Sequence, residues 1–229
     1  MIDEIINKFI NKEDFVYGFA EVSGLLSGIY SEYNYGIVIG KRLDKNIIDS
    51  INNGPTQTYL DHYKEINQEL TTLAIDISRE LNKCGILSVP TVPSLAGKKQ
   101  DADYEKYLSR DISHKMLATR AGLGWIGKTA LFISEKFGPR LRLVSILTNT
   151  PLNYGQKPVT ESRCEDCTIC IDACPAQAGN GTLWNTTIHR DIFFNAHKCR
   201  EMCRVLGKKN IGFDASICGI CVSVCPYGD

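Results

Sequence analysis

The pattern of apolar positions predicts a layered mixture of strands and helices in the first two thirds of the chain. Four apolar segments rich in β-branched and aromatic residues are predicted strands: 15–22, 35–40, 85–93 and 141–148. Apolar residues recur at helical spacing through 59–81, which predicts a long helix, and shorter helical patterns cover 3–9 and 111–120. Helices interspersed between strands favour an α/β or α+β fold for this part.

The distribution of cysteines divides the chain into two parts. Cys84 stands alone, and the other nine cysteines lie between Cys164 and Cys225. Residues 150–159 hold Pro, Gly and Asn and show little periodicity, as connecting segments do. We therefore predict an α/β domain at 1–152 and a small cysteine-rich module at 153–229. Cys84, at the end of the predicted long helix, is interpreted as an inert thiol of the core.

Charge and the N-terminus restrict the classes of partner. Acidic and basic residues number 26 each, so the chain has no overall field to attract a polyanion such as nucleic acid. The charged N-terminus and the absence of an apolar run of 18 residues predict a cytoplasmic protein with no membrane partner. Because cytoplasmic thiols stay reduced, the ten cysteines are interpreted as metal ligands rather than disulfides.

The cysteine spacing is typical of two [4Fe-4S] clusters. One run reads C-x2-C-x2-C-x3-C-P from Cys164, and a later run reads C-x2-C-x3-C-P from Cys218. In such proteins the fourth cysteine of a run binds the other cluster. One predicted ligand set is Cys164, Cys167, Cys170 and Cys225; the other is Cys174, Cys218, Cys221 and one of Cys199 or Cys203. Structural zinc and buried free thiols are the alternatives, but zinc usually shows separated C-x2-C knuckles.

A glycine-rich segment lies between the two parts. Residues 122–129, GLGWIGKT, satisfy both the P-loop pattern and G-x-G-x-x-G. The preceding residues are helix-forming rather than a buried strand, and no acidic residue for Mg²⁺ ends the next strand, so a nucleotide site is not favoured. Two interpretations stay open: a platform for a large flat ligand, or a tight turn between domains with Trp125 as its packing anchor.

Residues 121–129, followed by the run from Cys164 and the ending from Cys218, resemble the epoxyqueuosine reductase family and, more distantly, the reductive dehalogenases. The resemblance covers residues 59–229. It implies a nitroreductase-like, cobalamin-binding domain joined to a ferredoxin-like module whose two clusters deliver electrons to cobalt. It also implies that Cys199 is the eighth cluster ligand, and that the corrin lies against Gly122, Gly124, Trp125, Gly127 and Lys128. A flavin in the same pocket is the less favoured cofactor.

Two departures from the family affect the predicted chemistry. The stretch before residue 121 lacks the family's Asp-x-x-Pro, so its proton donor cannot be carried over. Asp111 and His114, expected one turn apart on a helix, are the candidate acids, although such a pair is more often a solvated helix face or a capping interaction. The family's helical tRNA-binding extension is absent after Cys225, which predicts a short form that does not bind tRNA.

These features predict an iron–sulfur reductase. An external donor such as ferredoxin or flavodoxin would reduce the clusters, which would reduce a bound corrinoid acting on a small substrate. The alternative is a non-enzymatic electron carrier or reductive activator of a partner protein.

Overall fold

The computed structural model describes residues 1–93, 102–153 and 155–228. Its centre is a four-stranded antiparallel sheet in the order β1-β2-β6-β3, with bounds Phe15–Glu21, Tyr35–Arg42, Leu141–Thr148 and Ser88–Pro90. Strands β2 and β6 pair along their whole length, and Val38 faces Ser145 in the register. All the pairings in this sheet are antiparallel, so the fold is of the α+β rather than the parallel α/β type.

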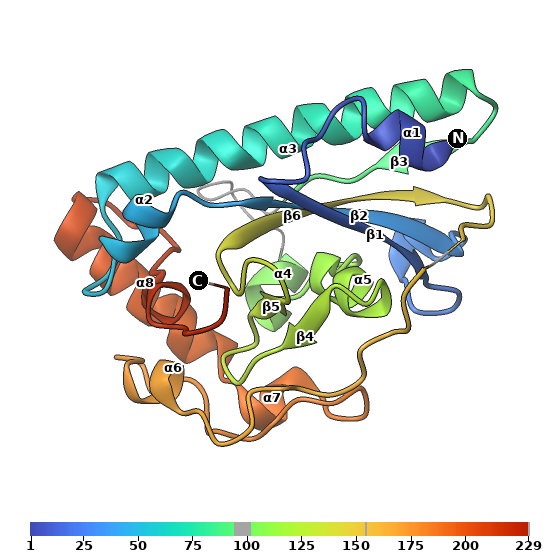
Figure 1. Ribbon diagram of the computed structural model, residues 1–229. Helices are drawn as coiled ribbons and strands as arrows, with labels where there is room; N and C mark the ends of the chain where they lie inside the picture. Colours follow the sequence, from blue (N-terminus) through green and yellow to red (C-terminus); the bar gives the residue numbers. More distant parts are fainter. Residues whose placement is uncertain (94–101, 154, 229) are drawn as a thin grey trace.

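One face of the sheet is covered by the long helix α3, Gln57–Lys83 (Figure 1). The hydroxyl of Thr56 caps its first turn by accepting a hydrogen bond from the backbone N–H of Tyr59 at 3.2 Å. Its buried stripe, which includes Leu60, Leu70 and Ile77, packs on the sheet in the larger of two main core clusters. The predicted helix is confirmed, with two more residues at each end.

The opposite face carries α5, His114–Arg120, and a hairpin of β4, Gly124–Ile126, and β5, Phe132–Ser134. Leu117 of α5 lies so close to Gly36 of β2 that a side chain at position 36 would collide with it. This close packing forms the second core cluster, which also includes Phe132 and Leu147.

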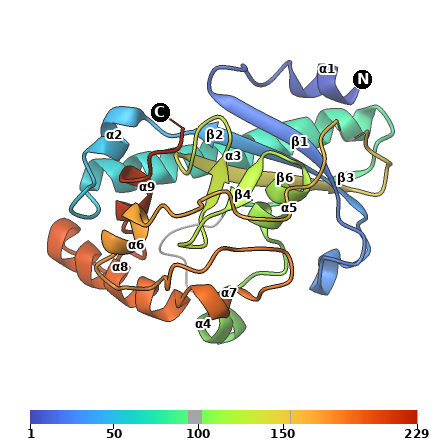
Figure 2. The same cartoon turned by 60° about the horizontal axis from the view of Figure 1, so that its bottom comes forward.

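Short helices and the cysteine-rich part surround these layers (Figure 2). The remaining elements are α1 Ile2–Ile6, η1 Gly28–Tyr30, α2 Lys45–Asp49, α4 Ala102–Tyr107, α6 Ile169–Asp172, α7 Arg190–Phe193, α8 Ala196–Ile211 and α9 Ile220–Ser223. From the cysteine-rich part, Ile217 and Val222 join the same core cluster as α3. The two predicted parts therefore share core residues rather than meeting only at a linker.

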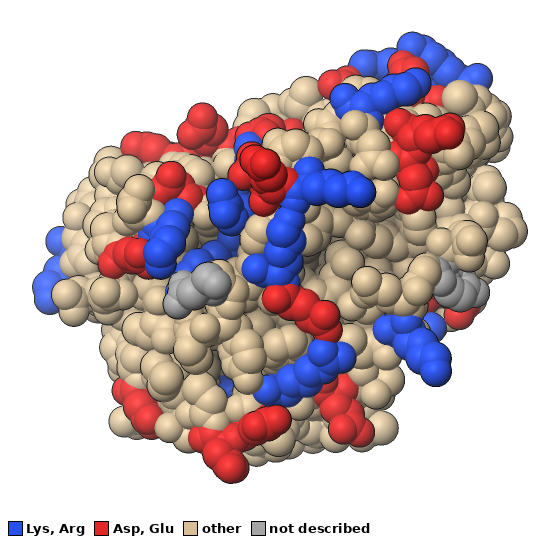
Figure 3. All heavy atoms as spheres, in the orientation of Figure 1, with Lys and Arg blue, Asp and Glu red and all other residues tan. Residues whose placement is uncertain are grey.

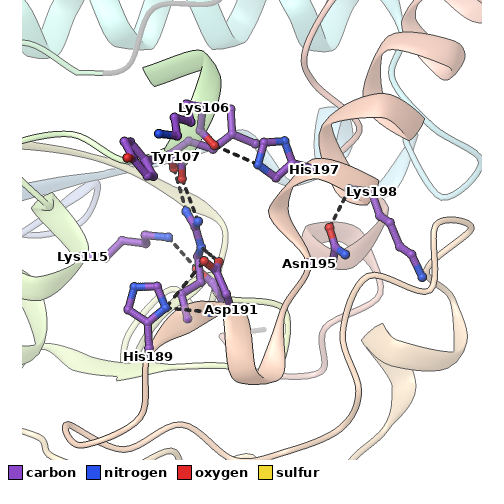
Figure 4. A network of polar contacts seen from close by, with 11 residues as sticks. Lys106, Tyr107, Lys115, His189, Asp191, Asn195, His197 and Lys198 are labelled. Carbon is purple, nitrogen blue, oxygen red and sulfur yellow. Dashed lines mark hydrogen bonds and ion pairs between the residues drawn. The ribbon is translucent and has the colours of Figure 1, made fainter. Parts of the chain in front are cut away.

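Helix α4 joins the two parts on another side of the molecule. The guanidinium of Arg190 donates to the carbonyl oxygens of Tyr107 and Leu108 at 2.8 and 2.7 Å. The ring of His197 lies 3.2 Å from the carbonyl oxygen of Lys106 (Figure 4). These contacts attach the end of α4 to α7 and α8.

The predicted strands are confirmed, although β3 occupies only three residues of 85–93. Two predictions are wrong. The helix expected at 111–120 begins at His114, because the Ser113 side chain caps it by accepting from the Met116 N–H, and this leaves Asp111 outside the helix. Cys84 is exposed rather than buried, and it is the C-cap residue that follows the last residue of α3.

Charged side chains of both signs are interspersed on the face shown in Figure 3. Lysines and arginines there alternate with aspartates and glutamates, in keeping with the balanced composition. Among the described residues, no helix combines the length and apolar character needed to cross a bilayer.

Candidate metal centres

Five cysteines line a first hollow: Cys221 of α9, which also lines the second hollow described below, and four others that come from three segments. Cys164 and Cys167 lie in a turn, Cys170 in α6, and Cys225 after α9. The Cys167 N–H donates to the Cys164 carbonyl at 3.0 Å, which holds the turn. The hollow has about 350 Å³, counting space open to solvent. The structure thus brings Cys225 to the three cysteines that cross-ligation predicts as its partners.

A second hollow lies beside the first and is lined by the remaining cysteines of the cysteine-rich part. Its thiols are those of Cys174, Cys199, Cys203, Cys218 and Cys221, and Phe194 and Met202 supply apolar walls. Cys174 therefore turns away from its own run and faces residues of α8 and α9, as the interleaved arrangement requires.

Cys199 and Cys203 both reach this second hollow. They lie four residues apart on α8, so their side chains project from the same helix face. Cys203 donates hydrogen bonds toward Cys199 and Cys218. These bonds raise the pKa of Cys203, lower that of Cys199, and lower the pKa of Cys218 to about 7. Cys199 as the eighth ligand remains a prediction.

Burial opposes ionisation of several of these thiols. Desolvation raises the pKa of Cys170 and Cys221 and raises that of Cys225 to about 11. A bound cation reverses this preference, because metal-ligated thiols are deprotonated. Within the described residues, no three Cys, His, Asp or Glu side chains are arranged to hold a single metal ion. The thiols instead line the two hollows, and this donor set fits iron–sulfur clusters.

The glycine-rich turn packs against the first ligand set. The indole N–H of Trp125 donates to the sulfur of Cys164 at 3.4 Å, and its ring lies edge-on to Tyr227 with centroids 5.0 Å apart. A Cβ at Gly124 would lie 1.9 Å from the carbonyl oxygen of Ile133, and a Cβ at Gly122 would lie 2.8 Å from that of Lys157. The glycines are therefore needed for close approach of backbone segments.

Lys128 belongs to the same turn and is also directed at the cysteine loop. Its ammonium group donates to the carbonyl oxygens of Glu165 and Cys167 at 2.7 and 3.0 Å. Gly127 lies beside Cys164, since a Cβ there would stand 3.5 Å from the Cys164 sulfur. Trp125, Gly127 and Lys128 thus all lie against the first ligand set or the loop that carries it.

Arg140 contacts the backbone at the C-terminal end of this ligand set. The sequence did not predict this role. Its guanidinium donates to the carbonyl oxygens of Tyr227 at 2.8 Å and Cys225 at 3.0 Å. No motif marks it, because its acceptors are backbone atoms more than 80 residues away. Thr129, the last residue of the P-loop-like segment, lines both hollows but was not among the residues predicted for the site.

Neither of the two candidate acids lines the hollows. Both ring nitrogens of His114 are engaged, with the Ser145 hydroxyl at 2.9 Å and the Val92 carbonyl at 3.2 Å. Desolvation lowers the pKa of His114 to about 4, so the ring is neutral at neutral pH. Asp111 is exposed, and its carboxylate lies 3.5 Å from the hydroxyl of Ser27. The hydrogen bonds of these two side chains thus go to other partners, and a catalytic role for Asp111 and His114 stays a prediction.

A known protein family matches the cysteine-rich part of the chain. Residues 163–228 match the family model described as a 4Fe-4S double cluster binding domain. Curated relatives matched by this chain carry the name epoxyqueuosine reductase.

The chain is similar to the epoxyqueuosine reductases. The Synechocystis enzyme is 34% identical over 126 residues, which are 51% of this chain and 39% of the relative. The Vibrio cholerae enzyme is 26% identical over 185 residues, or 76% of this chain and 43% of the relative. The chain thus aligns with less than half the length of these epoxyqueuosine reductases.

Solved structures share the fold. A catabolic reductive dehalogenase has a TM-score of 0.69 at 14% identity and covers 93% of this chain, while the chain covers 30% of the dehalogenase. The epoxyqueuosine reductase of Streptococcus thermophilus has a TM-score of 0.58 at 20% identity, covering 99% of this chain and 65% of its own. Another epoxyqueuosine reductase structure holds a modified tRNA stem loop, so the relatives do not support the expectation against tRNA.

Proposed function

We propose that the protein is an iron–sulfur oxidoreductase with two [4Fe-4S] clusters. The first would be held by Cys164, Cys167, Cys170 and Cys225, and the second by Cys174, Cys199, Cys218 and Cys221. The observation that carries the proposal is the grouping of these thiols around two adjoining hollows. Clusters at such close range pass single electrons between them, which is the task of a reductase or an electron carrier.

The chain's own residues would hold and shield the first cluster. Trp125 and Arg140 are 4% and 6% exposed, so their hydrogen bonds to Cys164 and to the Cys225 carbonyl act away from bulk water. Lys128, also buried, fixes the loop between Cys164 and Cys167. Buried donors and positive charges near cluster sulfurs favour the reduced state.

The proposal extends to a corrinoid acting on a small substrate, in a nitroreductase-like N-terminal domain. A bound corrinoid would supply low-potential cobalt chemistry that no side chain provides. The corrinoid would be bordered by Gly122, Gly124, Trp125, Gly127 and Lys128. Its domain would span residues 1–152, and the cluster module would span residues 153–229. The donor would be a ferredoxin or flavodoxin in the cytoplasm, where the thiols stay reduced.

One observation favours a second candidate, an electron carrier without a corrinoid. The side chains of Trp125 and Lys128, predicted to border the corrin, are engaged with the cysteine loop instead. A carrier or reductive activator would use the same two clusters and pass electrons to a partner protein. A flavin is the less favoured cofactor, and it would bind in the same pocket as the corrinoid.

The test is anaerobic purification and reconstitution, with measurement of iron, acid-labile sulfide, cobalt and absorption spectra. We expect about eight iron atoms per chain and a broad cluster absorption. Cys170→Ser should lose part of the iron, whereas Cys84→Ser, at the exposed end of α3, should lose none. Colourless wild-type protein, or protein loaded with zinc and free of sulfide, would refute the iron–sulfur function.

Cofactor and acceptor are tested in the same preparation. Retention of cobalamin through gel filtration, with a corrin absorption band, would support the reductase. Reduction of an added acceptor would then be assayed with small substrates and with a tRNA stem loop such as an epoxyqueuosine reductase structure contains. Cluster-bearing protein that binds neither cobalamin nor flavin would be the carrier.

A further inference from the structure

The two ligand sets differ in the side chains that approach them. Lys128 lines the first hollow, and its ammonium group donates to the two carbonyl oxygens of the cysteine loop described above. Apart from its thiols and Thr129, the second hollow is lined by Pro175, Ala176, Phe194, Met202 and Ile220. Among the described residues, no lysine, arginine, aspartate or glutamate lines this second hollow. The two sets therefore lie in unequal electrostatic surroundings.

An indole N–H group reaches a sulfur of the first set directly. Trp125 donates to the Cys164 sulfur at 3.4 Å, and the two residues are 4% and 8% exposed. Because little water reaches this bond, the N–H dipole acts on the sulfur with weak screening. A hydrogen bond to a cluster sulfur is one of the interactions that set the reduction potential, and it favours the more negative, reduced cluster.

The charged groups near the two sets act in the same direction. Arg140 adds a buried positive charge to the first set through its bond to the Cys225 carbonyl. Glu165 and Asp166 carry the opposite charge in the cysteine loop, but both are exposed, so water and salt screen them. Near the second set, the Lys115 ammonium donates to the carbonyl of residue 130 in the hairpin rather than to a cysteine-bearing loop.

We propose that Trp125, together with Lys128 and Arg140, makes the first cluster the more easily reduced of the two, so that the first electron delivered to the protein is held there. In this step an external one-electron donor is oxidised and the first cluster is reduced, while the second cluster stays oxidised. The inference rests on the proposed pair of clusters. It assigns to the glycine-rich segment a role in the order of reduction rather than in binding nucleotide.

The first test asks which cluster holds the first electron. The chain has two tryptophans, Trp125 and Trp184, so nitrogen-15 at the indole nitrogen marks Trp125 alone in the reconstituted Trp184→Phe protein. Dithionite is added under anaerobic conditions to one electron per chain, and pulsed electron paramagnetic resonance records nuclei coupled to the unpaired electron. We expect a nitrogen-15 coupling, because the reduced cluster is the one that accepts the Trp125 bond.

The second test measures the midpoint potential of each cluster in an anaerobic titration. Trp125→Phe should disfavour one-electron reduction of the first cluster by about threefold to tenfold, which is a fall of about 28 to 59 mV. The second cluster should keep its potential. Trp184→Phe is the matched control, because Trp184 packs against the same small core of Trp125, Ile133, Cys164 and Cys225 and tests for loss of packing alone. It should keep both wild-type potentials.

Each contrary result has a distinct meaning. A reduced-cluster signal without nitrogen-15 coupling would show that the second cluster is reduced first and would overturn the proposal. An unchanged first potential in Trp125→Phe would overturn the role of Trp125. Wild-type protein without clusters would instead refute the proposed function. The labelling test does not use Trp125→Phe, so it decides the order of reduction even where that variant fails to assemble.

Discussion

The indole nitrogen of Trp125 donates a hydrogen bond to the Cys164 sulfur at 3.4 Å. This contact joins the β4–β5 hairpin to the first cysteine of the run, 39 positions later in the chain. The Trp125 ring, Ile133 of β5, Cys164 and Cys225 form a small core cluster of their own. The first ligand set is therefore built on the N-terminal part of the protein and is not an independent loop.

Replacing Trp125 with Phe should remove the N–H···S bond and leave a gap in this core. We expect the free energy of unfolding to fall by about 2 kcal/mol, from one lost hydrogen bond and partial loss of packing. Chemical denaturation of the holoprotein measures the change. Trp184→Phe is the control, because Trp184 is only half-buried; an equal effect in both variants would contradict a special role for Trp125.

Replacing Arg140 with Gln should loosen the last residues of the structure. The change leaves the buried carbonyl oxygen of Cys225 and the part-buried carbonyl oxygen of Tyr227 without their charged donor, at a cost of about 2 to 4 kcal/mol. Hydrogen exchange of residues 218–228 should accelerate. Arg42→Gln is the control: its 3.3 Å pair with Asp14 is exposed and should contribute under about 1 kcal/mol. Unchanged exchange in Arg140→Gln would refute the role.

The choice between Cys199 and Cys203 can be made by iron analysis of two serine variants. Cys199→Ser should hold about four iron atoms per chain in place of about eight, because a cluster loses a ligand. Cys203→Ser should retain the full content, since Cys203 is expected to be the spare thiol. The reversed pattern would make Cys203 the ligand and Cys199 its hydrogen-bonded neighbour.

His114 should make stability depend on pH in the acidic range. Its pKa is about 4 in the folded protein and near 6.5 when unfolded, so between these values the unfolded chain binds more protons. The free energy of unfolding should therefore fall as the pH drops from about 6.5 to about 4, by on the order of 2 to 3 kcal/mol.

The contribution of His114 is isolated by comparing the pH dependence of the unfolding free energy between the wild type and variants. His114→Gln should flatten the difference between denaturation at pH 7 and pH 4.5, whereas His189→Gln, with a side chain 74% exposed, should leave that difference as in wild type. Identical pH profiles for wild type and His114→Gln would show that His114 does not titrate in this way.

Periodicity predicted the strands and the long helix because burial on one face leaves a regular trace in the sequence. The strand 141–148 and the helix around 59–81 follow this rule. The start of α5 was misplaced because a capping serine, rather than the apolar pattern, decides where that helix begins. The β4–β5 hairpin was missed because its strands are three residues each and contain too little pattern to detect.

The sequence by itself determined the kind of site: the spacing of the cysteines from Cys164 and from Cys218 indicates two interleaved clusters, since ligand spacing along a short loop is a local property. Only the tertiary structure decided what surrounds them. Trp125, Lys128 and Arg140 reach the cysteines through contacts between segments far apart in the chain, and such contacts depend on how the layers pack. No local pattern records them, because a buried donor needs only to be near its acceptor in space.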